Sequence, residues 1–220
     1  MFAVIFDFDG TILDSETAEF HSHRQLFQDW GLTLTEDEWC EGVGILKPDT
    51  HWFDKLCARA PDPPDFTRFR QLTHRYFHQH VRMEPMPGVS ALLGALVAAG
   101  VPRAVASGAP SDWVRSGLEG VGLASSFDAI VTSDQVPNGK PAPDVYLEAA
   151  RRMGVEATNC VALEDSGPGL ASARAAGMRT VVIPHTLTRL HDLSGADMQV
   201  KSAADLSLET LRALAQGRPN

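Results

Sequence analysis

Short apolar runs alternate with segments of helical period over most of this chain. Apolar runs of strand length occur at residues 2–6, 103–106, 129–131, 160–163 and 180–183. Segments whose apolar residues recur with the helical period lie at residues 87–99, 111–120, 143–153, 169–176 and 206–215. Gly100, Gly154 and Gly177 directly follow three of these segments, where glycine commonly ends a helix. The pattern predicts an α/β fold with a mostly parallel sheet covered by helices on both faces.

The alternation is interrupted once, between residue 15 and about residue 83. This interval contains amphipathic helical stretches without a convincing strand, and it holds Trp30, Trp39 and Trp52, three of the four tryptophans. A helical insert needs its own small core, and these large side chains would fill it. Prolines and a glycine at residues 85–88 mark a linker that could act as a hinge. We therefore predict an α/β core from residues 1–14 and 86–220, and a helical domain from residues 15–85.

Composition and charge narrow the function classes. The 220-residue chain is 44% hydrophobic and 21% charged, and no apolar run approaches the ~18 residues that span a bilayer. A net charge of −9 repels nucleic acid and anionic membranes, so neither is expected as a partner. An anionic substrate would need a few local cations and a bound metal ion to hold it. Because the amino terminus lacks a secretory signal pattern, we expect a cytoplasmic protein, and we expect a monomer.

Two aspartates directly follow the first apolar run. Asp7 and Asp9 are two residues apart, so both side chains point to the same side of an extended chain, and Gly10 permits the tight reversal that follows. Neighbouring carboxylates repel unless a cation neutralises them or one stays protonated, so the pair can supply a metal ligand and a proton-transfer group. An isolated Asp-x-Asp-Gly has an alternative interpretation, a helix-capping aspartate with a solvated neighbour.

Three further elements follow later apolar runs and favour the cation site. Ser107 and Gly108 follow residues 103–106, where a hydroxyl and backbone amides either cradle a phosphate or simply begin a helix. Lys140 lies in a Gly-Lys-Pro-Ala-Pro run whose prolines hold it extended, so it is either an ammonium aimed inward or a surface lysine. Glu164 and Asp165 close residues 160–163, where two acids either bind a cation or cap a helix.

All four elements are predicted to lie at the carboxyl ends of strands. In open parallel sheets, ligands collect beyond these ends. Asp7, Glu164 and Asp165 would together form a hard, oxygen-only site of the kind that Mg²⁺ prefers. The pattern therefore favours a magnesium-assisted site for an anionic substrate at one edge of the sheet.

These motifs resemble those of haloacid dehalogenase superfamily phosphatases, in the branch that contains β-phosphoglucomutase and phosphoglycolate phosphatase. The resemblance covers the whole core in the right order, and the insert at residues 15–85 occupies the place of that branch's helical cap. It implies a Rossmann-like, doubly wound parallel sheet with an inserted α-helical cap domain. The matching residues are the Asp-x-Asp-Gly-Thr-x-x-Asp-Ser run at residues 7–15, Ser107 with Gly108, Lys140 in its Gly-Lys-Pro-x-Pro run, and Glu164-Asp165-Ser166 followed by Gly169 and the alanine-rich stretch to Gly177.

The resemblance implies the reacting groups. Asp7 would be the nucleophile that forms an aspartyl-phosphate, and Asp9 would be the general acid and then the general base. Members of the family that cleave carbon–halogen bonds lack an acid at the position of Asp9, because a halide leaves without protonation. An acid at Asp9 therefore indicates an oxygen leaving group.

The resemblance also implies how substrate and metal are held. Thr11 and Ser107, with Gly108, would bind phosphoryl oxygens, and Lys140 would offset the charge of nucleophile and phosphoryl group. The implied Mg²⁺ ligands are Asp7, the backbone carbonyl of Asp9, and Asp165, with Glu164 either a direct ligand or the partner of one.

The leading hypothesis is a Mg²⁺-dependent phosphatase of small phosphorylated metabolites, such as sugar phosphates or phosphoglycolate. The alternative is a β-phosphoglucomutase-like isomerase. The family's mutases have a cap histidine soon after the first motif and an arginine-containing cap loop, whereas here His21 lies later and residues 42–47 lack the arginine. A non-catalytic phosphometabolite-binding protein is the third possibility. Substrate selection is expected in the insert, with candidate contacts at His21, Arg24, Lys47, His51, Arg75 and His78.

Overall fold

The computed structural model describes residues 1–42 and 48–217, which form two compact units. The first, called the core unit here, comprises Met1–Leu13, Met83–His185 and His191–Asn220. The second, called the helical unit, comprises Asp14–Arg82 and Thr186–Leu190. The segment Thr186–Leu190 lies within the range predicted for the α/β core, yet it groups with the helices of the second unit.

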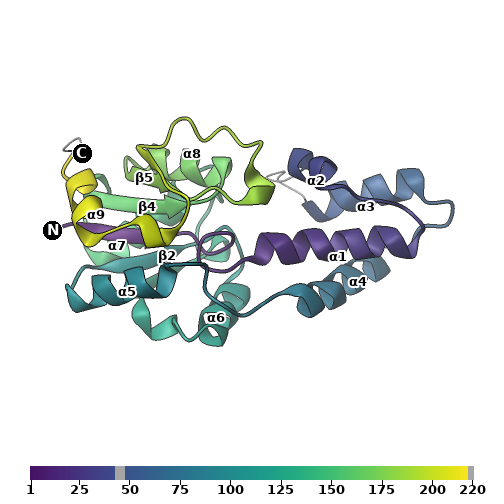
Figure 1. Cartoon of the computed structure of the whole chain (residues 1–220), viewed down its shortest axis with the longest axis horizontal. Coiled ribbons are helices and arrows are strands. Elements are labelled where there is room, and N and C mark those ends of the chain that lie inside the picture. Colours follow the sequence, from purple (N-terminus) through teal and green to yellow (C-terminus); the bar gives the residue numbers. More distant parts are fainter. Residues whose placement is uncertain (43–47, 218–220) are drawn as a thin grey trace. The chain divides into compact units, whose positions relative to one another are not determined.

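The core unit is built on a six-stranded, fully parallel sheet (Figure 1). Strand β1 is central: Ile5 lies between Ala104 of β2 and Ala162 of β4. The chain adds β2 and β3 on one side of β1, and then β4, β5 and β6 on the other, in the order β3-β2-β1-β4-β5-β6. This confirms the predicted doubly wound α/β fold. The strands are β1 (Ala3–Phe6), β2 (Arg103–Ala106), β3 (Ala129–Val131), β4 (Cys160–Glu164), β5 (Arg179–Val182) and β6 (Met198–Gln199).

The central strands are apolar along their whole length because helices cover both faces of the sheet. All four residues of β1 and all five of β4 are buried. Strand β6 was not predicted, since its two residues are incompletely buried and form no apolar run. Such a short edge strand carries too little pattern to be seen in the sequence.

Each helix-period segment of the core forms a helix whose ends lie within two residues of the prediction. Gly100, Gly154 and Gly177 follow helices with φ of 63°, 67° and 78°, as expected for left-handed caps. None of the described helices is both long and apolar enough to cross a membrane. The core helices are α5 (Val89–Ala98), α6 (Ser111–Gly120), α7 (Asp144–Met153), α8 (Gly167–Ala175) and α9 (Leu208–Ala215), with short 3₁₀ turns at Ala124–Ser126, Ser133–Gln135, Ala157–Asn159 and Ala203–Asp205.

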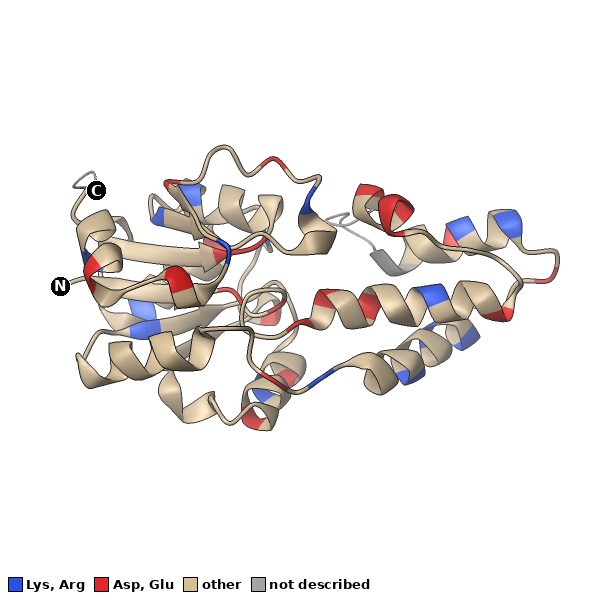
Figure 2. Cartoon of the chain, in the orientation of Figure 1, with Lys and Arg blue, Asp and Glu red and all other residues tan. Residues whose placement is uncertain are grey.

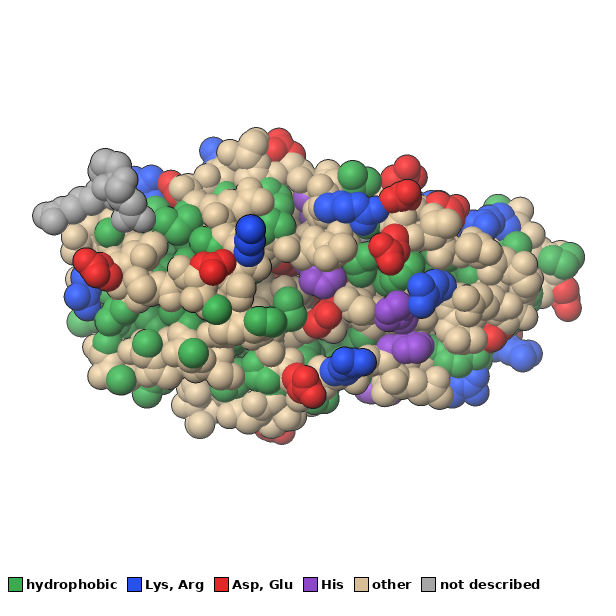
Figure 3. All heavy atoms as spheres, viewed as in Figure 1, with side chains coloured by type: hydrophobic (Ala, Val, Ile, Leu, Met, Phe, Trp, Pro, Cys, Tyr) green, Lys and Arg blue, Asp and Glu red, His purple; other side chains and the backbone are tan. Residues whose placement is uncertain are grey.

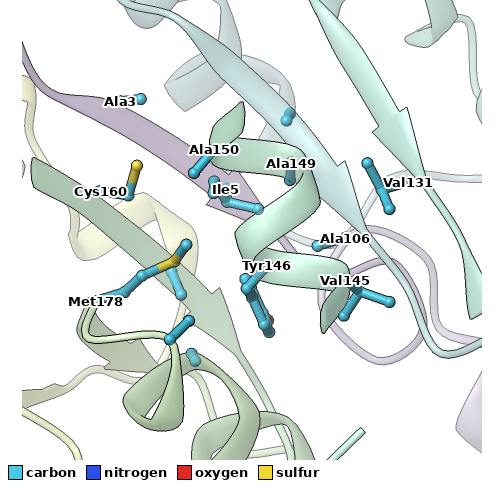
Figure 4. Packing of buried hydrophobic residues seen from close by; sticks show 14 of the residues in the cluster. Ala3, Ile5, Ala106, Val131, Val145, Tyr146, Ala149, Ala150, Cys160 and Met178 are labelled. Atoms are coloured by element: carbon cyan, nitrogen blue, oxygen red, sulfur yellow. The ribbon is translucent and has the colours of Figure 1, made fainter. Parts of the chain in front are cut away.

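Helix α7 packs across the middle of the sheet (Figure 4). It contributes Val145, Tyr146, Ala149 and Ala150 to a buried cluster that includes Ile5 of β1. The alanines of the helix leave room for close approach to the strands, and fully buried aliphatic and aromatic side chains fill the rest of the layer. This packing brings the first turn of α7 to the carboxyl end of the sheet.

The helical unit has its own aromatic core. Helix α1 packs along α4, and Trp39 and Trp52 stack with ring centroids 4.6 Å apart. Trp30 packs at the edge of the same cluster, and Leu187 of the Thr186–Thr188 turn also belongs to it. The three tryptophans of the predicted insert thus contribute to one small core. The helices are α1 (Ser15–Asp29), α2 (Glu36–Gly42), α3 (Pro48–Arg59) and α4 (Phe66–His80).

Replacing Ile5 by alanine tests the packing between β1 and α7. Ile5 is fully buried, so Ile5→Ala should lower the free energy of unfolding by about 2–5 kcal/mol through lost transfer energy and an unfilled cavity. Leu147→Ala is the control, because Leu147 lies on α7 with 43% of its surface exposed, and a change of roughly 0.5 kcal/mol or less is expected. Urea unfolding measures the free energy of unfolding of both variants. An equal decrease in Ile5→Ala and Leu147→Ala would contradict the packing of Ile5 against α7.

Candidate active site

Strand β1 runs directly into the first acidic motif. The Asp7 N–H still donates to Leu163 O of β4 at 2.9 Å, so Asp7 continues the strand geometry. The chain then reverses at Gly10, whose φ of 74° favours glycine. Backbone hydrogen bonds from Ile12 to Phe8 O and from Gly10 to Leu13 O close the loop. Asp7 is therefore held rigidly where β1 ends, with only 6% of its surface exposed.

Lys140 lies between two buried carboxylates. Its Nζ donates to Asp7 Oδ1 at 2.6 Å and to Glu164 Oε1 at 2.6 Å. The lysine side chain is only 9% exposed, so it is not the surface lysine of the alternative interpretation. Figure 2 shows acidic positions where strand β4 ends. The Lys140 ammonium offsets part of their negative charge. The ion triad joins the loop after β1, the segment before α7 and the end of β4.

Glu164 accepts five hydrogen bonds from the surrounding protein. Lys140 Nζ and the Tyr146 hydroxyl donate to Oε1, each at 2.6 Å. The Asp165 N–H, the Ser166 N–H and the Ser166 hydroxyl donate to Oε2 at 3.1–3.4 Å. A Cβ at Gly169 would lie 2.0 Å from the Glu164 carboxyl group, so only glycine leaves this space open. Glu164 is therefore an anchor for Lys140 as much as a possible cation ligand.

The pKa values in this triad are shifted by burial and by one another. Burial raises the pKa of Asp7 to about 8, the charge of Glu164 adds to the increase, and Lys140 opposes it. Burial alone would lower the pKa of Lys140, but the two carboxylates more than offset this and raise it above its ordinary value. Burial and the charge of Glu164 also raise the pKa of Tyr146 well above that of a free phenol. Two acidic groups share one ammonium, so a further cation beside them would favour the ionised form of Asp7.

Asp165 completes an acidic cluster suited to a metal ion. Ligand oxygens of Asp7, Glu164 and Asp165 lie within 4.8 Å of one another, and all three residues are buried. A Cβ at residue 10 would lie 2.4 Å from Asp165 Oδ2, so Gly10 is what permits the Asp165 carboxylate to approach the first loop. Oxygen-only donor sets of this kind fit hard divalent cations. The residues present therefore fit the metal ion that the sequence motifs imply.

The predicted phosphate-binding residues differ in their surroundings. Thr11 is buried, and its hydroxyl has no hydrogen-bond partner within the described part of the chain. Ser107 is fully buried at the end of β2, and its hydroxyl accepts from the Ala109 N–H at 3.0 Å. Gly108 is exposed. A buried hydroxyl without a partner costs free energy, so an external acceptor beside Thr11 would be stabilising.

Asp9 lies in a different environment from Asp7. It is only half-buried, and its Oδ1 accepts a 2.9 Å hydrogen bond from the indole N–H of Trp113 on α6. Trp113 and Tyr146 both contact predicted site residues, but the sequence motifs include neither. The available signals were weak: Tyr146 lies six residues after Lys140, and Trp113 is the one tryptophan outside the helical insert.

Comparison with known proteins identifies the family. The sequence profile of the haloacid dehalogenase-like hydrolases matches residues 4–183, most of the chain. The chain belongs to this family of hydrolases. The resemblance stated from the motifs is thereby confirmed, and so is the expected enzyme class, a phosphoric monoester hydrolase.

Three relatives show what this hydrolase is similar to. Fructose-1-phosphate phosphatase YqaB of Escherichia coli is 34% identical over 183 residues, which cover 81% of this chain and 94% of the relative. A phosphorylated carbohydrates phosphatase of Thermotoga maritima is 30% identical over 192 residues, covering 85% and 87%. The crystal structure of a CbbY variant from Rhodobacter sphaeroides, in complex with xylulose-(1,5)bisphosphate, has a TM-score of 0.78 at 27% identity and covers 96% of this chain and 99% of that one.

The candidate substrate contacts that the structure describes lie in the helical unit, where histidines gather on the face shown in Figure 3. His21 and His51 are half-buried, and burial lowers the pKa of both imidazoles. The Nε2 atoms of His74 and His78, one helical turn apart, lie 3.1 Å from each other. Arg24 is half-buried and Arg75 is exposed, whereas Lys47 lies outside the described residues. These contacts stay predictions.

The two tyrosines of this hydrolase provide a matched test of the Glu164 anchor. Tyr146→Phe removes a buried donor to a charged oxygen and should lower the free energy of unfolding by about 1.5–3 kcal/mol. Tyr76→Phe removes the bond from a more exposed hydroxyl to Asp29, and about 1 kcal/mol or less is expected. Urea unfolding at neutral pH measures both variants. A loss for Tyr146→Phe no larger than that for Tyr76→Phe would contradict the anchor.

Proposed function

We propose that this hydrolase is a Mg²⁺-dependent phosphatase that releases phosphate from small phosphorylated metabolites through an aspartyl-phosphate on Asp7. The observation that carries the proposal is the buried Lys140 ammonium, 2.6 Å from Asp7 Oδ1 and from Glu164 Oε1. Phosphoryl transfer needs positioning and compensation of charge more than covalent chemistry by the protein. A buried cation against the attacking carboxylate supplies that compensation where solvent screening is weak.

Sugar phosphates are the proposed substrate class. The names of two relatives that are at least 30% identical give phosphorylated carbohydrates and fructose 1-phosphate as what those proteins act on. A third relative was crystallised with a sugar bisphosphate. A net charge of −9 makes a small anion held in one compensated pocket a better substrate than a polyanion. Phosphoglycolate shares the phosphate but not the sugar, and it remains within the proposed range.

In the first step, a carboxylate oxygen of Asp7 attacks the phosphorus. The bond from phosphorus to the leaving oxygen breaks, and Asp9 protonates that oxygen. Lys140 holds Asp7 in place and offsets the charge that builds up between nucleophile and phosphoryl group. The Thr11 hydroxyl and the Ser107 and Gly108 turn are proposed to hold the phosphoryl oxygens, which would give the buried Thr11 hydroxyl the partner it lacks among the described residues.

In the second step, Asp9 accepts a proton from a water molecule whose oxygen attacks the phosphorus. The bond between phosphorus and Asp7 breaks, inorganic phosphate forms, and both aspartates return to their starting states. Asp7 and Asp165, with the Asp9 backbone carbonyl, are the proposed ligands of Mg²⁺, and Glu164 supports them from its anchor. When bound, Mg²⁺ supplies positive charge that neutralises phosphoryl oxygens and carboxylates.

Substitution of the nucleophile tests the function. Asp7→Asn keeps the shape of the side chain but removes the attacking carboxylate, so Mg²⁺-dependent release of phosphate from an aryl phosphate should fall by about 10⁴-fold or more. Colorimetric phosphate release measures the change. Asp54→Asn, at an exposed aspartate of α3, is the control and should retain full activity.

The same assay separates the competing interpretations. Formation of glucose 6-phosphate from β-glucose 1-phosphate faster than release of free phosphate would replace the phosphatase with the isomerase. Binding of phosphorylated sugars without turnover by the unmodified protein would instead support the non-catalytic binding protein. Persistent phosphate release in Asp7→Asn would exclude the aspartyl-phosphate.

Metal binding should depend on pH through Asp7. Because the pKa of Asp7 is raised to about 8 in the metal-free site, the carboxyl group is mostly protonated below that pH, and Mg²⁺ must displace the proton. The apparent affinity should therefore rise about tenfold per pH unit from about pH 6 to 7 and level off above about pH 8. Calorimetric titration in two buffers of different ionisation enthalpy measures affinity and proton release. Asp7→Asn is the control, because its side chain does not titrate in this range. If the Mg²⁺ affinity of the unmodified protein stays constant from about pH 6 to about pH 8, Asp7 is not the group that the metal ion deprotonates.

A further inference from the structure

Trp113 is a half-buried residue of the core unit that the sequence motifs do not include, and it contacts the proposed general acid. Its indole N–H donates to Asp9 Oδ1 at 2.9 Å, although 104 residues separate the two in sequence. Trp113 lies in the first turn of α6, the helix that follows the Ser107 turn. The contact therefore joins the first acidic motif to the helix that follows Ser107 and Gly108.

The position of Trp113 is fixed by Phe8, the residue between the two aspartates. Phe8 is fully buried and meets Trp113 edge to face, with ring centroids 6.1 Å apart at 77°. Gly117 lies one helical turn beyond Trp113, on the same face of α6. A Cβ at Gly117 would lie 2.4 Å from Phe8 Cζ, so glycine is what lets α6 approach the loop this closely. The helix face is thus shaped around Phe8, and this packing places the indole beside Asp9.

The indole N–H has only one chemical role here, because it donates and cannot accept. An oxygen that already accepts this N–H is the poorer site for the acid proton of the same carboxyl group. We propose that Trp113 is a positioning residue, which fixes the Asp9 carboxyl so that Oδ2 carries the proton and faces the leaving oxygen. This inference rests on the phosphatase function proposed above.

In this arrangement Asp9 gives a proton in the first step and takes one in the second. As the bond between phosphorus and the leaving oxygen breaks, its electron pair stays on the oxygen, which takes the proton of Asp9 Oδ2 and departs as an alcohol. Asp9 Oδ2 then takes a proton from the attacking water as the bond between phosphorus and Asp7 breaks. Trp113 takes part in neither bond. By keeping Oδ1 engaged, it makes the same oxygen give the proton and take one back.

The dependence of rate on the leaving group tests this role. General acid catalysis matters for an alkoxide, whereas a strongly acidic nitrophenol leaves without a proton. Trp113→Phe, which keeps a ring against Phe8 but removes the N–H, should lower kcat/KM by about 10–100-fold for alkyl phosphates. For dinitrophenyl phosphate the change in kcat/KM should be less than about threefold. This constant reports the steps up to loss of the leaving group, and dinitrophenol leaves without a proton from Asp9. The assays use the full chain with Mg²⁺.

Two controls isolate the hydrogen bond to Asp9. Trp30→Phe also removes an indole donor, but Trp30 donates to the backbone carbonyl of Asp62 at 2.7 Å in the helical unit, and it should keep the leaving-group dependence of the unmodified enzyme. Asp9→Asn should lose more activity than Trp113→Phe on alkyl phosphates. Adding Trp113→Phe to Asp9→Asn should then cost little more, because the two residues act through one group.

The possible outcomes decide between the hypotheses. Equal losses by Trp113→Phe across the substrate series, or full additivity with Asp9→Asn, would overturn the positioning role and leave the phosphatase intact. If Trp113→Phe does not fold, Trp113→Leu removes the same donor with a smaller side chain and carries the same test. Absence of phosphate release by the unmodified enzyme from any substrate would instead refute the proposed function itself.

Discussion

The contact of one buried ammonium with two buried carboxylates is the interaction on which the site depends. Each ion would cost several kcal/mol if it were buried alone. Lys140 meets both Asp7 and Glu164 at 2.6 Å, and the Tyr146 hydroxyl supplies a further donor to Glu164. The triad holds two acidic groups and one basic group, and burial raises the pKa of Asp7 to about 8. In the function proposed here, the further positive charge that a phosphate needs in this strongly acidic protein would enter with a metal ion.

The register of the sheet brings the two carboxylates to one ammonium. Phe6 of β1 pairs with Leu163 of β4, so Asp7 and Glu164, the next residue along each chain segment, lie side by side. A shift of the pairing by one residue would turn one carboxylate toward the opposite face. Because both strands are buried along their length, such a shift would also disrupt the core. The apolar packing that stabilises the fold therefore also sets the geometry of the charged site.

The sequence predicted the parts of the fold and site that depend on local pattern. Five of the six strands, the five core helices and the acidic ends of β1 and β4 follow from apolar runs and the residues after them. Strand β6 and the grouping of Thr186–Leu190 with the helical unit depend on contacts between distant segments, which no local pattern records. Tyr146 and Trp113 were missed for the same reason, since the pattern of a helix indicates which face is buried but not which hydroxyl or N–H meets a carboxylate.

Asp7 and Asp9 lie two residues apart but have different hydrogen-bond donors, and the different roles proposed for them need different surroundings. Asp7 is buried against the Lys140 ammonium, which favours its ionised form, while burial and the charge of Glu164 oppose ionisation and raise its pKa. Asp9 is half-buried and accepts a hydrogen bond from the neutral indole of Trp113. Catalysis by two carboxylates requires environments that differ in this way. The two donors come from the loop before α7, which carries Lys140, and from α6, which carries Trp113.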